Sequence, residues 1–228
     1  MSSFSAPVIG AGSRTIPVAP GKKPTALQVH ADHYLGDYLN LPRMMTYWYQ
    51  AKAVRDCGGR SVLEIGIGMG LTSWIMQRWG LEVSTLDLDP ELSPTCIGDL
   101  RSMPCAEGSF NAILIAEVLE HLPFDQFAAC LAELRRVCRK NVIVTLPCPL
   151  VGFHVGINVP LLEPIFLAMG FRQYSKPRFD GQHYWELDRL GYPKRRIRES
   201  LREGGFKIAS EFRPGLSLYN YFFVLEKR

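Results

Sequence analysis

The stretch Val62-Leu63-Glu64-Ile65-Gly66-Ile67-Gly68-Met69-Gly70 decides the fold, because a short apolar run leads into three glycines. The apolar run predicts a buried strand, and the apolar residues from Leu71 to Trp79 recur at helical spacing until Gly80. Glycines let the backbone pass close to a ligand, and the N–H groups at the start of a helix face that ligand. The stretch therefore predicts a strand, a ligand-binding turn and a helix.

Strand and helix patterns alternate around this unit. We expect helices near 42–54, 71–79, 127–137 and 194–203 and strands near 61–65, 82–87, 96–97, 110–116, 141–146, 206–212 and 219–225. This order predicts an α/β, Rossmann-like, doubly wound sheet of seven strands, mostly parallel, with a reversed C-terminal strand. The segment 147–193 is rich in Pro, Gly and aromatic residues and shows no clear period, so no regular element is expected there.

Composition excludes several classes of protein. Of the 228 residues, 47% are hydrophobic and 21% are charged, which fits one soluble domain and excludes wholesale disorder, collagen and coiled coil. The longest weakly polar stretch, 157–171, is too short for a membrane-spanning helix. The net charge of +4 is uneven, since 172–228 contain 13 Lys and Arg against 7 Asp and Glu. That basic third predicts either an anionic partner or an ordinary solvated surface.

The cysteines and the N-terminus bear on metal sites and location. None of the six cysteines has CxxC spacing, and no nearby histidine completes a zinc pattern. We therefore expect buried free thiols and no metal site. The first residues show no basic start followed by an apolar stretch, as a secretory signal would. These features predict a cytoplasmic protein.

Acidic residues follow the strands at the edge where the glycines lie. Asp87, Asp99 and Glu117 come at the ends of the second, third and fourth expected strands. Ligands of open α/β sheets bind at that edge, and a carboxylate there can accept hydrogen bonds from ribose hydroxyls or an amino group. A dinucleotide fingerprint would need glycine at position 71, where Leu71 stands. This disfavours a nicotinamide-dependent oxidoreductase, which stays as an alternative, as does a non-catalytic cofactor-binding module of the same fold.

The run from Val62 to Leu146 resembles the class I S-adenosylmethionine-dependent methyltransferases, in particular the group with a type 11 methyltransferase domain. The resemblance implies an enzyme that transfers a methyl group in line from S-adenosyl-L-methionine and releases S-adenosyl-L-homocysteine. The cofactor-binding residues that it implies are Glu64, Gly66, Gly68, Gly70, Asp87, Leu88, Asp99, Leu100 and Glu117. By the resemblance, the glycines border the methionine and ribose, the two aspartates hold the ribose hydroxyls and the adenine edge, and Glu117 lies near the sulfonium.

The methyl acceptor is the part that the sequence defines least. We expect a flexible N-terminal arm over 1–29 and a single domain over 30–228, in which 147–193 is inserted as an acceptor-side cap. His183 and Glu186 lie there among aromatic residues and are the candidate catalytic residues, with His183 as a base. The expected acceptor is a small metabolite, a glycan or a lipid-linked intermediate. Nucleic acid is left open but not favoured, and the oligomeric state is undefined.

Overall fold

The computed structural model describes residues 28–34, 38–161, 165–172, 175, 179 and 181–228. The expected arm, 1–29, lies outside the described residues apart from its last two positions. The helices are η1 (Ala31–Tyr34), α1 (Leu41–Asp56), α2 (Leu71–Arg78), η3 (Pro90–Leu92), η4 (Leu119–His121), η5 (Phe124–Gln126), α3 (Phe127–Val137) and α4 (Lys194–Glu203). The strands are β1 (Ser61–Ile65), β2 (Glu82–Asp87), β3 (Cys96–Ile97), β4 (Phe110–Ala116), β5 (Cys138–Pro147), β6 (Leu150–Ile157), β7 (Ile165–Arg172), β8 (Phe206–Phe212) and β9 (Asn220–Lys227).

Seven of these strands form one sheet in the order β3-β2-β1-β4-β5-β9-β8. The pairs β1 with β2, β1 with β4, β2 with β3 and β4 with β5 are parallel, whereas β9 runs antiparallel to both of its neighbours. The expected seven-stranded, mostly parallel sheet with a reversed C-terminal strand is therefore confirmed. The strand order changes direction between β1 and β4, and the carboxyl ends of strands at such a switch point form the usual ligand crevice.

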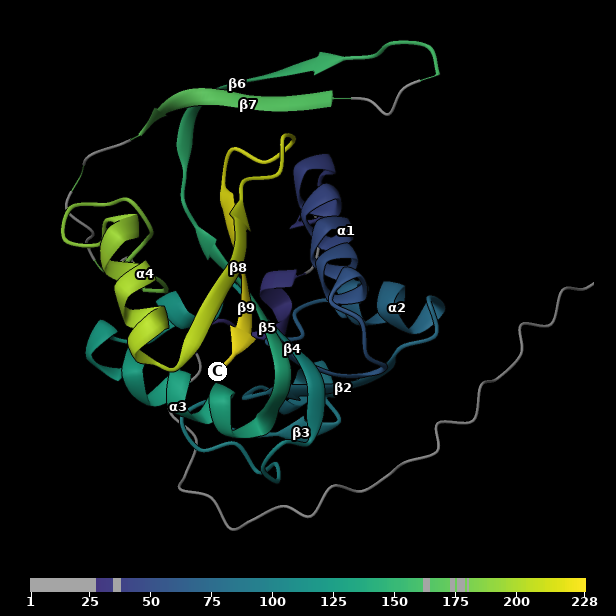
Figure 1. The fold of residues 1–228 in the computed structure, drawn as a ribbon, viewed down its shortest axis with the longest axis vertical. Helices are drawn as coiled ribbons and strands as arrows, with labels where there is room; N and C mark the ends of the chain where they lie inside the picture. The colour runs from purple at the N-terminus through teal and green to yellow at the C-terminus, as the bar shows by residue number, and fades with distance from the viewer. Residues whose placement is uncertain (1–27, 35–37, 162–164, 173–174, 176–178, 180) are drawn as a thin grey trace, which may run out of the picture.

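Helices cover both faces of the sheet. Figure 1 shows α1 and α2 on one side and α3 and α4 on the other. Successive residues of a strand point to opposite faces, so Leu63 and Ile65 pack in the cluster with α3 and α4, and Val62 packs with α1 and α2. Burial on both faces explains why the central strands are continuous apolar runs in the sequence. The six cysteines are unpaired and five of them are buried, as expected.

The segment 147–193 contains a regular element that we did not expect. β6 and β7 pair antiparallel in a hairpin, with Leu150 opposite Arg172 and Gly152 opposite Gly170. A Cβ on Gly152 would clash with the backbone of β7, so this close pairing requires glycine. Glycine within a run normally predicts a break rather than a strand, and this is why the expectation of an irregular segment was wrong.

The hairpin lies apart from the seven-stranded sheet, at the top of Figure 1. Its exposed large apolar side chains are Val151, Phe153, Ile157, Ile165, Phe166, Leu167, Met169 and Phe171. The described residues of the apolar stretch 157–171 are therefore mostly surface rather than core. Within the part of the chain that the structure describes, no helix has the length and apolar character needed to cross a membrane.

Candidate functional site

The turn after β1 has the backbone conformation that only glycine adopts readily. Gly66, Gly68 and Gly70 have φ angles of 80°, 51° and 74°. The N–H of Gly66 donates to the Leu86 carbonyl at 3.0 Å, which ties the turn to β2. A Cβ on Gly68 would lie 3.3 Å from the ring of Tyr34, so Tyr34 packs closely against this glycine. The turn thus brings bare backbone to the carboxyl end of the sheet.

Asp87 joins this turn to the end of β2. Its Oδ2 accepts a hydrogen bond from the Ile67 N–H at 2.9 Å, and its Oδ1 accepts one from the Asp89 N–H at 3.0 Å. Burial raises the pKa of Asp87, and the backbone hydrogen bonds partly offset that effect. Leu88 also bonds the carboxylate through its backbone N–H, and a carboxylate has about four lone-pair positions, so some acceptor capacity remains beyond these bonds. Asp87 is therefore able to accept from a ligand while it holds the turn.

A cavity of about 590 Å³ collects the predicted residues. The lining includes every residue of the predicted cofactor set except Gly70, namely Glu64, Gly66, Gly68, Asp87, Leu88, Asp99, Leu100 and Glu117. Gly70 instead precedes α2 in a left-handed conformation. A volume of this size is in the range of cofactor and small-molecule sites. The predicted residues are far apart in the sequence, and the structure brings them to one cavity.

Asp99 is bonded more tightly than the sequence suggested. Its Oδ1 accepts from the backbone N–H and the Nε of Arg101, both at 2.9 Å, and Arg101 Nη2 bonds its Oδ2. Arg101 also donates to Gln126 Oε1 at 2.9 Å, which links the loop after β3 to η5. Asp99 therefore has a structural role in this loop in addition to its place on the cavity wall.

Glu64 faces the same cavity from inside β1. Its side chain is almost fully buried, and it accepts a hydrogen bond from the Ser73 hydroxyl at the start of α2. Burial raises the pKa of Glu64 to about 8, although the bond from Ser73 opposes the shift. Glu64 therefore fixes the first turn of α2 against β1, behind the glycines.

Glu117 ends β4 in a strained conformation. It has a φ of 54°, which is rare for a residue other than glycine, and its N–H donates to the Thr145 carbonyl at 3.2 Å. Its Oε1 is buried and has no hydrogen-bond partner within the described residues. Burial raises the pKa of Glu117 to about 7, while the side chains of Asn220 and Thr145 favour the charged form. Strained backbone and an unsatisfied carboxylate are features that cluster at functional sites.

A group of tyrosines lies on the cavity wall, and the sequence analysis did not assign them to the site. Tyr34 and Tyr38 come from the residues before α1, and Tyr47 comes from α1 itself. The rings of Tyr34 and Tyr38 meet edge to face at 5.0 Å, and the guanidinium of Arg43 lies 3.7 Å from the centre of the Tyr38 ring. Burial raises the pKa of Tyr34 and of Tyr47. These residues are neutral phenols on the cavity wall, and Tyr34 lies against Gly68 of the turn.

His183 lies on the cavity wall, and Glu186 stands behind it. His183 Nδ1 is 3.1 Å from Glu186 Oε1, and Arg189 Nε donates to the other carboxylate oxygen at 2.9 Å. The hydrogen bond from His183 and the Arg189 guanidinium lower the pKa of Glu186, which is therefore an anion. Glu186 does not line the cavity. The structure thus places only His183 where it faces a ligand, and Glu186 orients its ring.

Hydrogen bonds fix the segment around His183 to the end of β4. The Tyr184 N–H donates to the Glu120 carbonyl at 2.9 Å, and the Trp185 indole N–H donates to the Leu122 carbonyl at 3.0 Å. Trp185 is fully buried and packs edge to face on Phe124 and Phe127. Trp185 is thus an anchor, and this anchoring is what brings His183 to the cavity.

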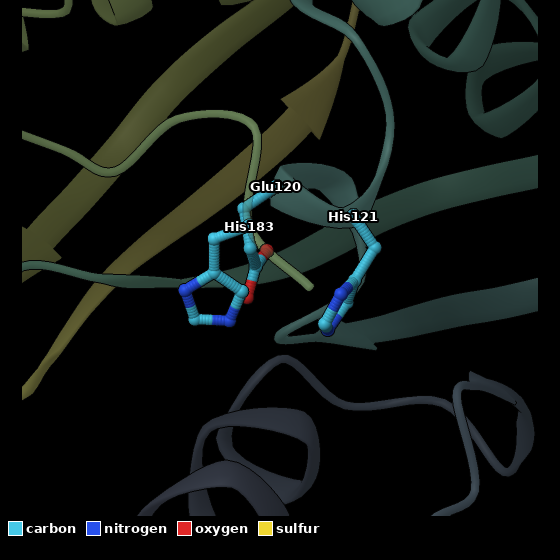
Figure 2. Close-up of side chains that lie close together, drawn as sticks. All are labelled: Glu120, His121 and His183. Atoms are coloured by element: carbon cyan, nitrogen blue, oxygen red, sulfur yellow. The ribbon is translucent and has the colours of Figure 1, made fainter. Parts of the chain in front are cut away.

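A second histidine and a buried glutamate lie beside His183. Glu120, His121 and His183 have ligating atoms that lie within 4.8 Å of one another, and the two imidazole rings are 5.0 Å apart. Figure 2 shows the Glu120 carboxylate next to the His183 ring, with the His121 ring alongside. The sequence analysis did not predict this cluster. The sequence signal for this cluster was the pair Glu120-His121 at the ligand-binding edge. The third member, His183, is distant in the sequence and could not be assigned to the pair without the structure.

The sequence between β1 and β5 matches a known family. Residues 63–146 match the family described as "Methyltransferase domain". A ubiquinone biosynthesis O-methyltransferase from Xanthomonas oryzae pv. oryzae (strain PXO99A) is 32% identical over 30% of this chain and 35% of its own length. A protein of the same description from Xanthomonas campestris pv. campestris (strain B100) is 34% identical over 28% and 34% of the two chains. The matched part thus spans about a third of these relatives.

Solved structures resemble the fold over most of the chain. The PH0226 protein from Pyrococcus horikoshii OT3 has a TM-score of 0.59 at 14% identity and covers 86% of this chain and 96% of its own. Magnesium protoporphyrin IX methyltransferase from Synechocystis PCC 6803, solved with bound SAH, has a TM-score of 0.55 at 17% identity and covers 86% and 92%. At these identities the likeness establishes the fold, which is that of the class I methyltransferases.

Proposed function

Because residues 63–146 match a methyltransferase domain and the sheet has the class I methyltransferase fold, we propose that this chain is an S-adenosylmethionine-dependent methyltransferase. The observation that carries the proposal is the single cavity in which the glycine turn, Asp87 and Asp99 meet. A glycine turn before a helix, followed by carboxylates at successive strand ends, suits a nucleoside ligand. The neighbour from Synechocystis was solved with SAH, which supports the same ligand class here.

In this proposal different residues of the cavity contact different parts of the cofactor. Gly66 and Gly68 lie against its methionine and ribose, since both line the cavity and neither has a side chain to keep the ligand from the backbone. Asp87 accepts from the ribose hydroxyls with the acceptor capacity that its backbone bonds leave. Leu88 and Leu100 contact the adenine ring. Gly70 acts indirectly by shaping the turn.

The acceptor binds beside the segment that begins at Glu117 and the segment around His183, which line the same cavity. We propose a small-molecule acceptor that is methylated on a hydroxyl oxygen. The two Xanthomonas relatives are described as O-methyltransferases, which supports oxygen as the methylated atom. The proposal that 147–193 caps the acceptor side rests on three of its residues, since His154 in β6, Gln182 and His183 all line the cavity.

The chemistry needs positioning more than acid or base strength. The cofactor supplies a methyl group on a positively charged sulfur, and positive charge disperses as the methyl moves to the acceptor. The protein must therefore align the acceptor oxygen and exclude water, which the aromatic wall of Tyr34, Tyr38 and Tyr47 does in part. A hydroxyl must also lose its proton. His183 is placed for that task, because Glu186 accepts its Nδ1 proton and leaves the Nε2 lone pair on the other side of the ring.

Isothermal titration calorimetry with S-adenosylhomocysteine and with NAD tests the cofactor. We expect binding of S-adenosylhomocysteine and none of NAD. Binding of NAD alone would replace this proposal by the oxidoreductase alternative. Binding of S-adenosylhomocysteine with no methyl incorporation into any fraction of a cell extract would favour a non-catalytic module.

His183→Ala tests the acceptor side. We expect single-turnover methyl transfer to fall by roughly 100-fold or more, while the affinity for S-adenosylhomocysteine stays nearly unchanged. Lys52→Ala is a suitable control, because Lys52 lies on the exposed side of α1, where its ammonium pairs with Asp56. A parallel loss of cofactor affinity in His183→Ala would place His183 in the cofactor site instead.

A further inference from the structure

We propose that Glu120, His121 and His183 bind a divalent metal cation at the acceptor side of the cavity. Two imidazoles and one carboxylate are a donor set that suits Mn²⁺, Fe²⁺, Co²⁺ and Zn²⁺ and leaves coordination positions open for a further ligand. The proposal rests on the proposed function only for its role in methyl transfer, since cation binding itself can be measured without any cofactor.

The first support is Glu120 itself. Its side chain is fully buried, and neither carboxylate oxygen has a hydrogen-bond partner within the described residues. An isolated carboxylate in the interior costs several kcal/mol unless it is paired or binds a metal. The neighbouring Glu117 adds a third buried oxygen without a partner in the described part of the chain. A cation would satisfy acceptors that the protein leaves in excess at this point.

The second support is the orientation of the two histidines. His121 Nδ1 lies 3.0 Å from the Gln182 carbonyl oxygen, and His183 Nδ1 lies 3.1 Å from Glu186 Oε1. Both oxygens only accept, so each Nδ1 carries the proton and each Nε2 carries a lone pair. Metal-binding histidines almost always donate their other ring N–H to a carbonyl or a carboxylate in this way. The structure therefore sets both rings in the tautomer that a metal needs.

The third support is distance and placement. The ligating atoms lie within 4.8 Å of one another, whereas a cation about 2.1 Å from each would hold them about 3 to 3.5 Å apart. The site therefore closes by roughly 1 to 2 Å when it is loaded, which rotation of the side chains supplies. Tyr184 and Trp185 are bonded to the segment of Glu120 and Leu122, so the backbones of the two halves are already held together.

The role that follows is activation of an acceptor hydroxyl. His121 and His183 line the cavity, so an acceptor oxygen there could complete the coordination of the cation. A bound cation lowers the pKa of an attached hydroxyl. The hydroxyl proton then passes to water, the oxygen lone pair forms the bond to the methyl carbon, and the sulfur keeps the electron pair of the broken bond. When the cation is bound, His183 Nε2 holds it and water takes the proton; only in the metal-free protein is the same Nε2 available as the base.

The experiment measures cation binding on the full chain after treatment with EDTA and desalting. MnCl₂ is titrated by calorimetry and by the loss of the free Mn²⁺ signal in electron paramagnetic resonance, with ZnCl₂ as a second probe. We expect one Mn²⁺ or Zn²⁺ per chain. His183→Ala and Glu120→Gln should weaken it by about 100-fold or more, and Glu186→Gln should weaken it by about 10-fold through the orientation of His183.

The matched control is His154→Ala, which removes a histidine of the same cavity from outside the cluster and should leave the cation affinity unchanged. Glu120→Gln preserves the shape of the side chain, so the variant should keep the melting temperature of the metal-free protein while losing the rise that Mn²⁺ gives the wild type. Two results would overturn the proposal. One is no binding of either cation up to about 1 mM, and the other is binding that His183→Ala and Glu120→Gln do not weaken.

The proposed function and this inference fail separately. If S-adenosylhomocysteine binds and methyl transfer proceeds at full rate in EDTA, the methyltransferase stands and the cation has no part in it. If the cation binds but S-adenosylhomocysteine does not, the metal site stands and the methyltransferase proposal is wrong.

Discussion

Replacing Asp87 removes the carboxylate that joins the glycine turn to the proposed ribose site. Asp87→Ala deletes both oxygens, and Asp87→Asn deletes the charge but keeps one acceptor. In the structure two acceptor positions of Asp87 are filled by the N–H groups of Ile67 and Asp89, at 2.9 and 3.0 Å. The acceptor capacity that remains is available to the two hydroxyls of a ribose.

The size of the effect follows from these two bonds. A hydrogen bond to a charged group contributes roughly 1.5–3 kcal/mol, and each 1.4 kcal/mol is about tenfold in affinity. Loss of one such bond therefore weakens binding by about 10- to 100-fold, and loss of both weakens it further. We expect a loss of about 10- to 100-fold or more for Asp87→Ala. The loss for Asp87→Asn should be smaller, about 10-fold, because an acceptor oxygen remains.

The assay is calorimetric titration with S-adenosylhomocysteine, and circular dichroism checks that each variant is folded. Asp56→Asn is the control for the change in charge, because Asp56 ends α1 on the exposed surface and pairs with Lys52. Its affinity should equal that of the wild type. If folded Asp87→Ala binds as tightly as the wild type, then Asp87 does not hold the ribose and the cofactor site is misassigned.

Two further predictions concern the residues around the turn. Gly68→Val should abolish binding of S-adenosylhomocysteine in a titration while the protein stays folded. Gly68 has a φ of 51°, and a side chain there would enter the cavity beside Tyr34. Unchanged binding would contradict this interpretation of the turn. Glu64 keeps its proton up to about pH 8 in the folded state but loses it near pH 4.5 when unfolded, so stability should fall as pH rises between these values. Glu64→Gln should flatten that part of the profile by up to about 5 kcal/mol in urea unfolding, and an unchanged slope would show that Glu64 is not protonated in the fold.

The sequence predicted the central sheet well because each decisive signal was local. The run from Val62 to Gly70 contains its own strand and turn, and the alternation of strands and helices around it fixed the fold class. The carboxyl ends of parallel strands meet at one edge, so Asp87, Asp99 and Glu117 could be assigned to one site without coordinates.

What the sequence did not predict depends on contacts between distant residues. His183 reaches Glu120 and His121 only because Trp185 anchors its segment, and no local pattern shows where an indole N–H will bond. The hairpin of β6 and β7 was missed because two glycines face each other across it, and glycine usually ends a strand. The tie between Asp99 and Arg101 needed side-chain geometry as well.

The reversed strand β9 has a consequence for synthesis of the chain. Residues 220–226 of β9 pair with 141–147 of β5, and β9 lies between β5 and β8, so the sheet stays open until β9 has left the ribosome. During that interval β5 presents a long, apolar, unpaired edge of the kind that recruits other chains. Chaperone demand during translation should therefore be set by the arrival of β9, and a chain stopped before residue 220 should aggregate rather than fold into a smaller enzyme.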